Sequence, residues 1–362
     1  MTLGLFLAIG ESLGDFKSKG QLKRLLNYNI KKYSQVFDKV YIFSYADEKY
    51  DLPKNCVLIS NRFKIHRYLY AFLIPIINYS LVKECNILRG LQITGGIPAF
   101  VSKILYKKRF VINYGYDYSS FARTERKYFQ ALFYTIIREP ILFTANKIIV
   151  PSKTIAQKLK KKFRNKIVYI PNGVDTKLFH PAKNKQKNKI LYIVFIGRLE
   201  EQKNLVNLIK ATKCLKMPYN LVFYGQGSKR DQLISLAKNL RVPLQIKEPT
   251  DYQNVAKILR TCDIFILPSH NEGSPKILLE ALASGCAVVA SNIPQITEII
   301  TDGKTGVVSS QEPHSLTRAI NKLQDHTLRQ KIGREAREMV KNKYEINKLL
   351  LQEVNILKNL SR

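Results

Sequence analysis

Two glutamates with seven residues between them, Glu272 and Glu280, lie in a segment whose pattern favours an anion-binding site. An apolar run over residues 263–267 predicts a buried parallel strand that ends at a Pro-Ser turn. A Gly-Ser-Pro sequence then opens a helix, with Pro275 in the first turn, where a missing N–H costs nothing. Because the amides at a helix N-terminus attract anions, the segment predicts a site for a phosphorylated sugar that the two acids bracket.

The two acids also have a simpler explanation. A glutamate near a helix start is favoured by the helix dipole and needs no ligand. The surrounding pattern favours the binding site, because a second apolar strand is predicted at residues 287–290, directly after the helix. A strand, a turn, a helix and another strand form one unit of a parallel sheet, whose carboxyl edge is where such sheets bind ligands.

A second group of residues with suitable chemistry follows the apolar run at residues 190–196. Gly197 ends this predicted strand, and Arg198 and Lys203 come directly after it. A glycine lets the backbone approach a ligand, arginine offers a planar fork to a diphosphate, and lysine adds a mobile point charge. Two such cations balance the two negative charges of a departing nucleotide diphosphate, although a basic residue in such a loop is more often only a surface residue.

The two segments, in this order, resemble the donor-binding elements of retaining nucleotide-sugar glycosyltransferases of family 4, part of glycosyltransferase group 1. The resemblance implies that Glu272 lies near the donor sugar, that Glu280 holds the ribose hydroxyls, and that the two cations bind the diphosphate. It implies a catalytic set of Glu272, Arg198 and Lys203, and donor-binding residues Gly197, Gly225, Gly273, Ser274, Pro275, Lys276 and Glu280. A tight turn between strand and helix explains Gly225 equally well.

Two segments of the first half correspond to the acceptor side in the same resemblance. Gly14 and Gly20 bracket a predicted loop between a strand and a helix, where relatives use a glycine to contact the donor phosphates and the acceptor. Tyr116 and Asp117 stand where many relatives carry a histidine, which this sequence lacks there. Asp117 fits equally well as the N-cap of the helix that follows, predicted over residues 119–143.

Short apolar runs alternate with longer helical periods along the whole chain, which predicts βαβ units and parallel sheets. The resemblance implies the GT-B architecture, in which two doubly wound, Rossmann-like α/β domains face each other across a cleft. We expect an acceptor-side domain at residues 1–170, a linker at 171–188 and a donor domain at 189–343. A C-terminal helix at 344–362 is expected to cross back to the first domain.

Cysteine and histidine usage limits the chemistry. The five cysteines form no Cys-x-x-Cys pair, which is typical of a reducing compartment, and the apolar N-terminal run is interpreted as a first strand. We therefore expect a cytoplasmic protein. The five histidines show no metal-ligand spacing, so we expect no metal and no cofactor, with the nucleotide-diphosphate sugar as the donor substrate.

The chain has a formal net charge of +33, and residues 1–170 hold 30 Lys and Arg against 10 Asp and Glu. Such a surface attracts anionic lipid, which suggests a peripheral position on the inner face of the plasma membrane; a solvated lysine-rich surface explains it equally well. The apolar stretch at 68–82 contains Pro75 and is too short to span a bilayer, so a buried or interfacial helix is expected.

The sequence therefore predicts a hexosyl-type glycosyltransferase, which moves a sugar with retention to a glycan or lipid-linked acceptor in cell-surface polysaccharide or glycolipid synthesis. A sugar-nucleotide epimerase on a similar scaffold is the alternative, but the acid and base residues it needs are not found. A basic nucleic-acid-binding protein ranks lower, because no recognised binding motif accompanies the charge. We expect no nucleic-acid partner.

Overall fold

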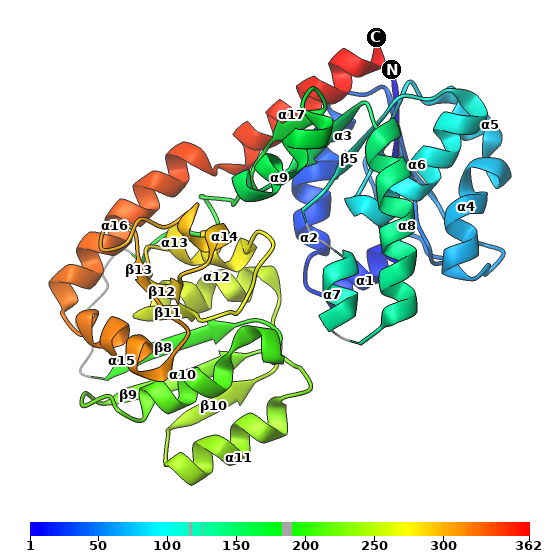
Figure 1. Ribbon diagram of the computed structural model, residues 1–362. Coiled ribbons are helices and arrows are strands. Elements are labelled where there is room, and N and C mark those ends of the chain that lie inside the picture. The colour runs from blue at the N-terminus through cyan, green and yellow to red at the C-terminus, as the bar shows by residue number, and fades with distance from the viewer. Residues whose placement is uncertain (116–117, 125, 183–189) are drawn as a thin grey trace. The chain divides into compact units, whose positions relative to one another are not determined.

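The computed structural model describes residues 1–115, 118–124, 126–182 and 190–362 and divides the chain into two compact units (Figure 1). The first unit comprises Met1–Pro171 together with Asn347–Arg362, and the second comprises Asn172–Ile346. Each unit is built on its own sheet, and the last residues of the chain belong to the first unit rather than the second.

The first sheet has seven parallel strands in the order β3-β2-β1-β4-β5-β6-β7. Most of its strands are apolar on both faces, as parallel strands covered by helices on both sides require. The strands are β1 (Thr2–Phe6), β2 (Lys39–Phe43), β3 (Cys56–Ile59), β4 (Ile87–Gly90), β5 (Phe110–Asn113), β6 (Lys147–Val150) and β7 (Ile167–Tyr169).

The helices of the first unit lie around this sheet. They are α1 (Leu13–Ser18), α2 (Leu22–Arg24), the π-helical η1 (Leu25–Ile30), α3 (Lys31–Ser34), α4 (Arg67–Ile77), α5 (Tyr79–Glu84), α6 (Gln92–Tyr106), α7 (Tyr118–Thr124), α8 (Tyr128–Thr144), α9 (Lys153–Phe163) and α17 (Ile346–Ser361). The prediction of one continuous helix over residues 119–143 is wrong, because α7 ends at Thr124 and α8 begins at Tyr128. Arg126, between α7 and α8, has a left-handed φ of +58°, which no right-handed helix accommodates.

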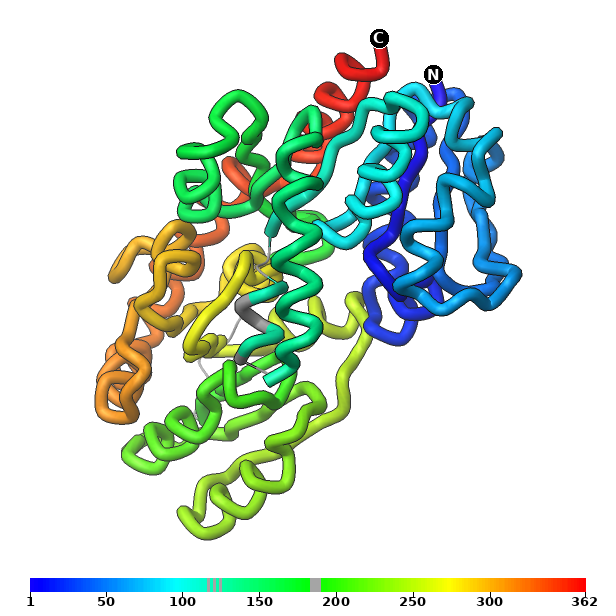
Figure 2. Tube along the Cα trace, turned by 45° about the vertical axis from the view of Figure 1, so that its right-hand side comes forward, coloured from blue at the N-terminus to red at the C-terminus, as the bar shows by residue number. Residues whose placement is uncertain are grey.

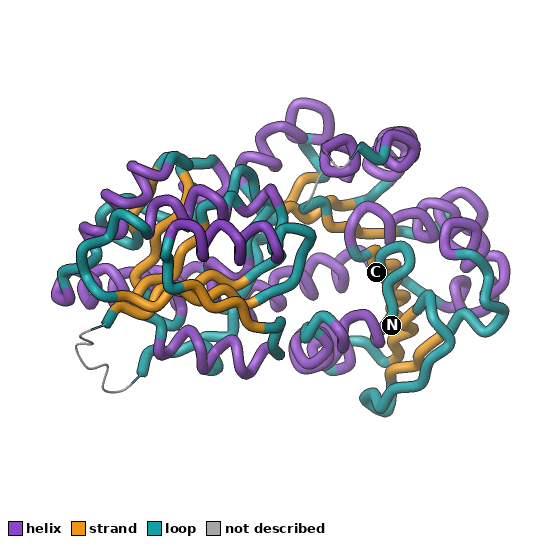
Figure 3. The backbone as a smooth tube through the Cα atoms, turned by 90° about the horizontal axis from the view of Figure 1, so that it is seen from below, coloured by secondary structure: helices purple, strands orange, loops and turns teal. Residues whose placement is uncertain are grey.

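The second sheet has six parallel strands in the order β10-β9-β8-β11-β12-β13, with helices on both sides (Figure 3). Its strands are β8 (Leu191–Ile196), β9 (Tyr219–Tyr224), β10 (Leu244–Lys247), β11 (Ile264–Leu267), β12 (Ala287–Ser291) and β13 (Val307–Ser309). Its helices are the 3₁₀ turn η2 (Glu201–Lys203), α10 (Leu205–Thr212), α11 (Arg230–Leu240), α12 (Tyr252–Thr261), α13 (Lys276–Ala283), α14 (Pro294–Thr297), α15 (Pro313–Lys322) and α16 (His326–Lys343). The prediction of two doubly wound parallel sheets is confirmed.

The segment expected to be a linker belongs largely to the second unit, as far as it lies in the described residues. Phe179 is fully buried and packs edge-on against the ring of Tyr252, at 4.9 Å between centroids. Arg337, on α16, donates to the backbone oxygens of Thr176 and Phe179. The Phe179 ring and the Arg337 guanidinium therefore hold this segment against the rest of the second unit.

Helix α17 completes the core of the first unit, where the chain ends beside its beginning (Figure 2). Its apolar side chains join the same cluster as those of β1 and β2. Its Glu353 accepts from Arg89 Nε at 2.8 Å and from the Tyr33 hydroxyl at 2.5 Å. Arg89 is 1% exposed, so this ion pair is buried. Burial, followed by the nearby Glu353 carboxylate, raises the pKa of Tyr33, which keeps its hydroxyl a donor.

Removing Glu353 should weaken the packing of α17 against the rest of the first unit. Breaking a buried ion pair by deleting one partner costs roughly 3–5 kcal/mol, because the other charge stays buried. We expect Glu353→Leu to lower the free energy of unfolding of the first unit by this amount in guanidinium titrations, and to speed hydrogen exchange in α17. Gln352→Ala, an exposed position one residue away, is the control. Equal midpoints for the two variants would contradict the importance of the pair.

Candidate functional site at the switch point of the second sheet

The order of strands reverses between β8 and β11 in the second sheet. From β8 the chain continues to β9 and β10 on one side, and from β11 to β12 and β13 on the other. The two strands pair in parallel, with Ile193 opposite Ile264 and Val194 opposite Phe265. The loops after Ile196 and Leu267 therefore leave the sheet side by side. Such a switch point is where open parallel sheets bind their ligands.

Lys203, from the loop after β8, meets Glu272, from the loop after β11. Lys203 Nζ lies 2.6 Å from Glu272 Oε1, and the two side chains are only 13% and 9% exposed. The Ser269 hydroxyl donates to the same carboxylate oxygen at 2.6 Å. Two residues that come from separate sequence motifs, 69 positions apart, thus form one nearly buried ion pair.

The loop after β11 is held from the side of β8 by neutral hydrogen bonds. The Gln202 side-chain amide donates to the Asn271 carbonyl oxygen at 2.8 Å, and the Gln202 carbonyl oxygen accepts from the His270 amide at 2.8 Å. Buried Asn204 donates to the Pro268 carbonyl oxygen at 3.2 Å. These bonds fix the loop without placing further charge beside the ion pair.

Two more side chains hold the same loop from other directions. The Gln311 amide donates to the carbonyl oxygens of Ser269 and His270, each at 3.3 Å, and Gln311 Oε1 lies 2.7 Å from His270 Nδ1. Asn172 donates to both the carbonyl oxygen and the hydroxyl of Ser274 at 2.9 Å. Sequence reasoning missed Gln202, Gln311 and Asn172 as positioning residues. The Pro-Asn-Gly turn at residues 171–173 marks Asn172 as a turn residue but does not indicate this contact. The two glutamines belong to no motif whose spacing would indicate their roles.

Helix α13 begins one residue after Pro275, which stands at the N-cap rather than inside the first turn. Gly273 and Ser274 form the turn before it, and exposed Lys276 is its first residue. Glu280 follows just over one turn into α13 and is 6% exposed. The helix thus starts at the switch point with Glu272 before it and Glu280 inside it.

The two turns after β8 and β9 pack directly on each other through glycines. A Cβ on Gly225 would lie 1.9 Å from the Gly197 carbonyl oxygen, and the Gly197 amide donates to the Tyr224 carbonyl oxygen at 3.0 Å. Both carbonyl oxygens belong to the backbone, so neither can move aside as a flexible side chain would. Close backbone packing therefore explains Gly225, beside the role near the nucleotide that the sequence suggests.

Arg198 is exposed in the loop after β8, and its guanidinium donates to Gln202 Oε1 at 3.3 Å. Next to it, the Glu200 carboxylate accepts from the Ser228 hydroxyl at 2.6 Å and from the Ser228 amide at 3.0 Å. The hydroxyl bond is the main reason that the pKa of Glu200 is lowered, with Arg198 and Lys229 contributing. Glu200 therefore stays ionised and ties the β8 loop to the turn before α11.

In the first unit, the loop expected between Gly14 and Gly20 is wrong, because α1 covers residues 13–18. Ser12 and Asp15 form a capping box at its start, a pattern favoured at helix N-termini. The Glu48 carboxylate accepts from the Leu13 amide at 2.8 Å and from the Gly14 amide at 2.9 Å. The Gly14 amide is thus bound by a protein carboxylate. Gly20, with a φ of +66°, ends the turn after α1.

The other two residues of the acceptor-side prediction, Tyr116 and Asp117, lie outside the described residues. Within the described residues, no three His, Cys, Asp or Glu side chains gather as a metal-binding group would.

Comparison with known proteins assigns part of the chain to a family. The family model for Glycosyl transferases group 1 matches residues 176–339, which include both the β8 and the β11 loops. This part of the chain is a group 1 glycosyltransferase domain. The two sheets of the chain are those of the GT-B fold.

Relatives of this glycosyltransferase include an uncharacterized glycosyltransferase of Methanocaldococcus jannaschii, MJ1069, at 26% identity over 359 residues, 89% of this chain and 90% of the relative. The capsular polysaccharide biosynthesis glycosyltransferase CapH of Staphylococcus aureus is 28% identical over 51% of each chain. Several curated relatives are matched over only about half of their length. The structure of Anabaena HepE in complex with UDP and glucose superposes with a TM-score of 0.78 at 14% identity, over 99% of this chain and 100% of that one.

The contact between Lys203 and Glu272 should appear as a coupling energy. Lys203→Met leaves a nearly buried carboxylate without its cation, and Glu272→Gln leaves the ammonium without its anion. In a double-mutant cycle we expect the double variant to regain about 1–3 kcal/mol relative to the sum of the single losses. Chemical unfolding of the second unit measures this, and strict additivity would show that the pair does not interact in solution.

Proposed function

We propose that the glycosyltransferase binds a nucleotide-diphosphate sugar at the switch point of its second sheet and transfers the sugar with retention of anomeric configuration. The observation that carries the proposal is the contact of Lys203 with Glu272, directly before the start of α13. Cations, helix amides and carboxylates then lie at one sheet edge, which is the set of groups that a sugar diphosphate requires.

The diphosphate is bound by Arg198 and Lys203 together with the amides at the start of α13. Arg198 is exposed and presents a planar fork to phosphate oxygens. The Lys203 ammonium carries three N–H donors, so it can hold Glu272 and also donate to a phosphate. As the bond between sugar and phosphate breaks, these groups stabilise the charge that develops on the leaving diphosphate. The proposal needs neither a metal nor a cofactor.

The two acids act on the donor in different ways. Glu272 Oε1 accepts from both Lys203 and Ser269, which orients the carboxylate toward the transferred sugar. Glu280, buried one turn into α13, accepts from the ribose hydroxyls. Neither is proposed as a covalent nucleophile, because Glu272 is fixed by an ion pair and Glu280 belongs to the ribose end of the site.

The anomeric configuration is retained because the acceptor attacks the sugar on the same face from which the phosphate departs. The bond from the sugar C1 to the phosphate oxygen breaks, and the acceptor oxygen forms its bond to C1 on the same face. The acceptor proton moves to the departing phosphate, so charge and atoms balance without a protein base. Nuclear magnetic resonance of the anomeric proton tests this step, since an inverted product is incompatible with it.

The acceptor is proposed to be a glycan or a lipid-linked sugar in cell-surface polysaccharide or glycolipid synthesis. The likeness to a capsular polysaccharide enzyme supports this class. The fold shared with a protein solved with UDP and glucose makes UDP-sugars the first donors to test, with GDP- and ADP-sugars next.

Arg198→Ala is the sharpest test of the donor site, because Arg198 is exposed and its removal leaves no buried charge. We expect kcat/KM for transfer to fall on the order of 10²–10³-fold, the usual loss when one charge-stabilising donor is removed. The thermal stabilisation by the nucleotide diphosphate should shrink with it. Arg318→Ala, an exposed arginine on α15, is the matched control. Lys203→Ala should give a similar loss while the protein stays folded, and unchanged transfer in both site variants would refute the proposal.

A further inference from the structure

Exposed apolar side chains are concentrated on the first unit. In the described part of the second unit, the large apolar side chains that are exposed are Ile190 and Ile234. The first unit exposes many more, and nearly all lie on α4, α5, α6, α8 and the loop before α4: Phe63, Leu69, Phe72, Ile76, Ile77, Tyr79, Ile104, Leu105, Tyr128, Phe129, Leu132, Ile136 and Phe143. Such a concentration of exposed apolar side chains on a few helices of one unit points to an interaction site.

Helix α8 is apolar on two opposite sides. Phe129, Leu132, Ile136 and Phe143 are spaced by three, four and seven residues, so they share one face, and Phe129 is 90% exposed. The opposite face buries residues such as Ile141 in the core. A helix on the outside of a unit normally turns a polar face to water, so the exposed apolar face of α8 departs from the usual pattern.

Helix α4 extends this surface. Its Leu69, Phe72 and Ile76 are exposed at helical spacing, and the Tyr68 ring meets the Phe133 ring of α8 edge-on at 5.3 Å. Helix α6 packs between α4 and α8, as Figure 1 shows. All three helices bury their inner sides in the same core cluster, so their outer sides point away from the same face of the sheet. We call this surface the α4/α6/α8 face.

Basic residues are abundant in the segment that forms the α4/α6/α8 face. Residues 61–170 contain 21 Lys and Arg against four Asp and Glu. Lys166 Nζ lies 5.4 Å from the ring centroid of Phe143, and Lys162 pairs with Glu139 on α8. Exposed basic residues lie at the starts of α4 and α8, namely Arg62, Lys64, Arg67, Arg126 and Lys127.

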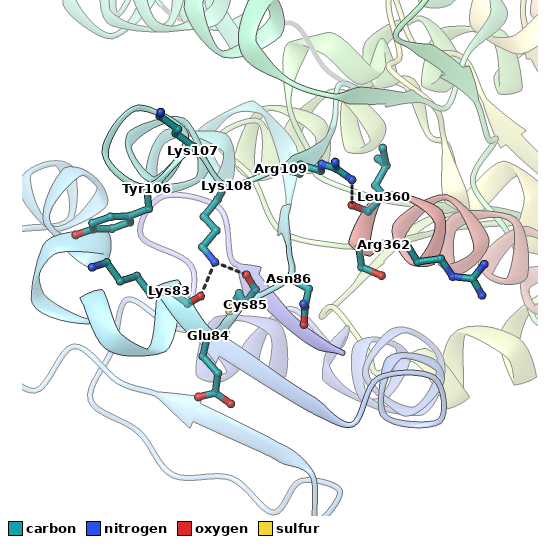
Figure 4. Close-up of a pocket in the computed structure, with 11 residues that line it drawn as sticks. Lys83, Glu84, Cys85, Asn86, Tyr106, Lys107, Lys108, Arg109, Leu360 and Arg362 are labelled. Carbon is teal, nitrogen blue, oxygen red and sulfur yellow. Dashed lines mark hydrogen bonds between the residues drawn. The ribbon is translucent and has the colours of Figure 1, made fainter.

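A largely basic pocket of about 320 Å³, whose lining also includes Glu84, opens at the C-terminal ends of α5, α6 and α17 (Figure 4). Its lining includes Lys83, Lys107, Lys108 and Arg109. Lys83 Nζ lies 5.7 Å from the ring centroid of Tyr106, which directly follows exposed Ile104 and Leu105. Tyrosine rings and lysine ammonium groups beside apolar side chains are the combination found where proteins meet the headgroup layer of a membrane.

We propose that the α4/α6/α8 face docks on the surface of an anionic lipid bilayer. The apolar side chains enter the boundary between headgroups and acyl chains, and the surrounding cations pair with lipid phosphates. None of the described helices has the length and apolarity to cross a bilayer, so the contact is with its surface. A second copy of this face would bring like charges together, and nucleic acid would leave the aliphatic side chains without a partner.

Co-sedimentation with lipid vesicles tests the proposal without any donor, so the outcome is independent of the proposed function. The full chain should pellet with vesicles of equal phosphatidylcholine and phosphatidylglycerol and much less with pure phosphatidylcholine. Raising the salt from about 0.05 M to about 0.5 M should weaken binding, because surface charges become screened. Phe129→Ser/Leu132→Ser/Ile136→Ser should lower the partition coefficient on the order of 10²-fold.

Ile234→Ser, at an exposed apolar position of the second unit, is the matched control and should bind like the wild type. Circular dichroism and thermal unfolding check that the triple variant is folded. Wild-type binding by a folded triple variant would overturn the proposal, and so would a wild type that stays in the supernatant. A dimer in sedimentation velocity without lipid that the triple variant abolishes would overturn it as well, by assigning the face to a second copy.

Discussion

The reversal of strand order between β8 and β11 is the constraint on which the proposed donor site depends. These strands are hydrogen-bonded neighbours, and the chain continues from β8 and from β11 toward opposite ends of the sheet, which places their two loops side by side. Lys203 and Glu272 meet in that position, each neutralising the other in a place with little water. A charge pair that is already oriented reduces the reorganisation needed when a charged ligand arrives.

The loop around this pair is held by neutral amide groups. Gln202, Asn204 and Gln311 donate to its carbonyl oxygens, and Asn172 holds its end at Ser274. Further lysines or acids would serve the same structural purpose but would compete for the phosphates of the proposed donor or repel them. Amide side chains fix the backbone and leave the local charge to Arg198, Lys203 and the acids, so rigidity and electrostatics are supplied by different residues.

The two units share a sheet type but differ in their helices. In the second unit, helices such as α10 and α12 bury one face and present polar residues on the other. In the first unit, α4 and α8 are apolar on both sides, and α17 adds a buried ion pair to the core. The second unit therefore holds the proposed donor site at one sheet edge, whereas the first presents many exposed apolar side chains on its outer helices.

The sequence by itself determined the two parallel-sheet units and the positions of both motifs, because buried parallel strands are continuous apolar runs and turn residues mark their ends. It did not determine that Asn172, Gln202 and Gln311 hold the β11 loop, that Glu48 binds the start of α1, or that the helix over residues 119–143 is broken. Only the tertiary structure decided these features. Hydrogen bonds between distant segments, and a backbone angle such as that of Arg126, depend on neighbours that linear spacing does not encode.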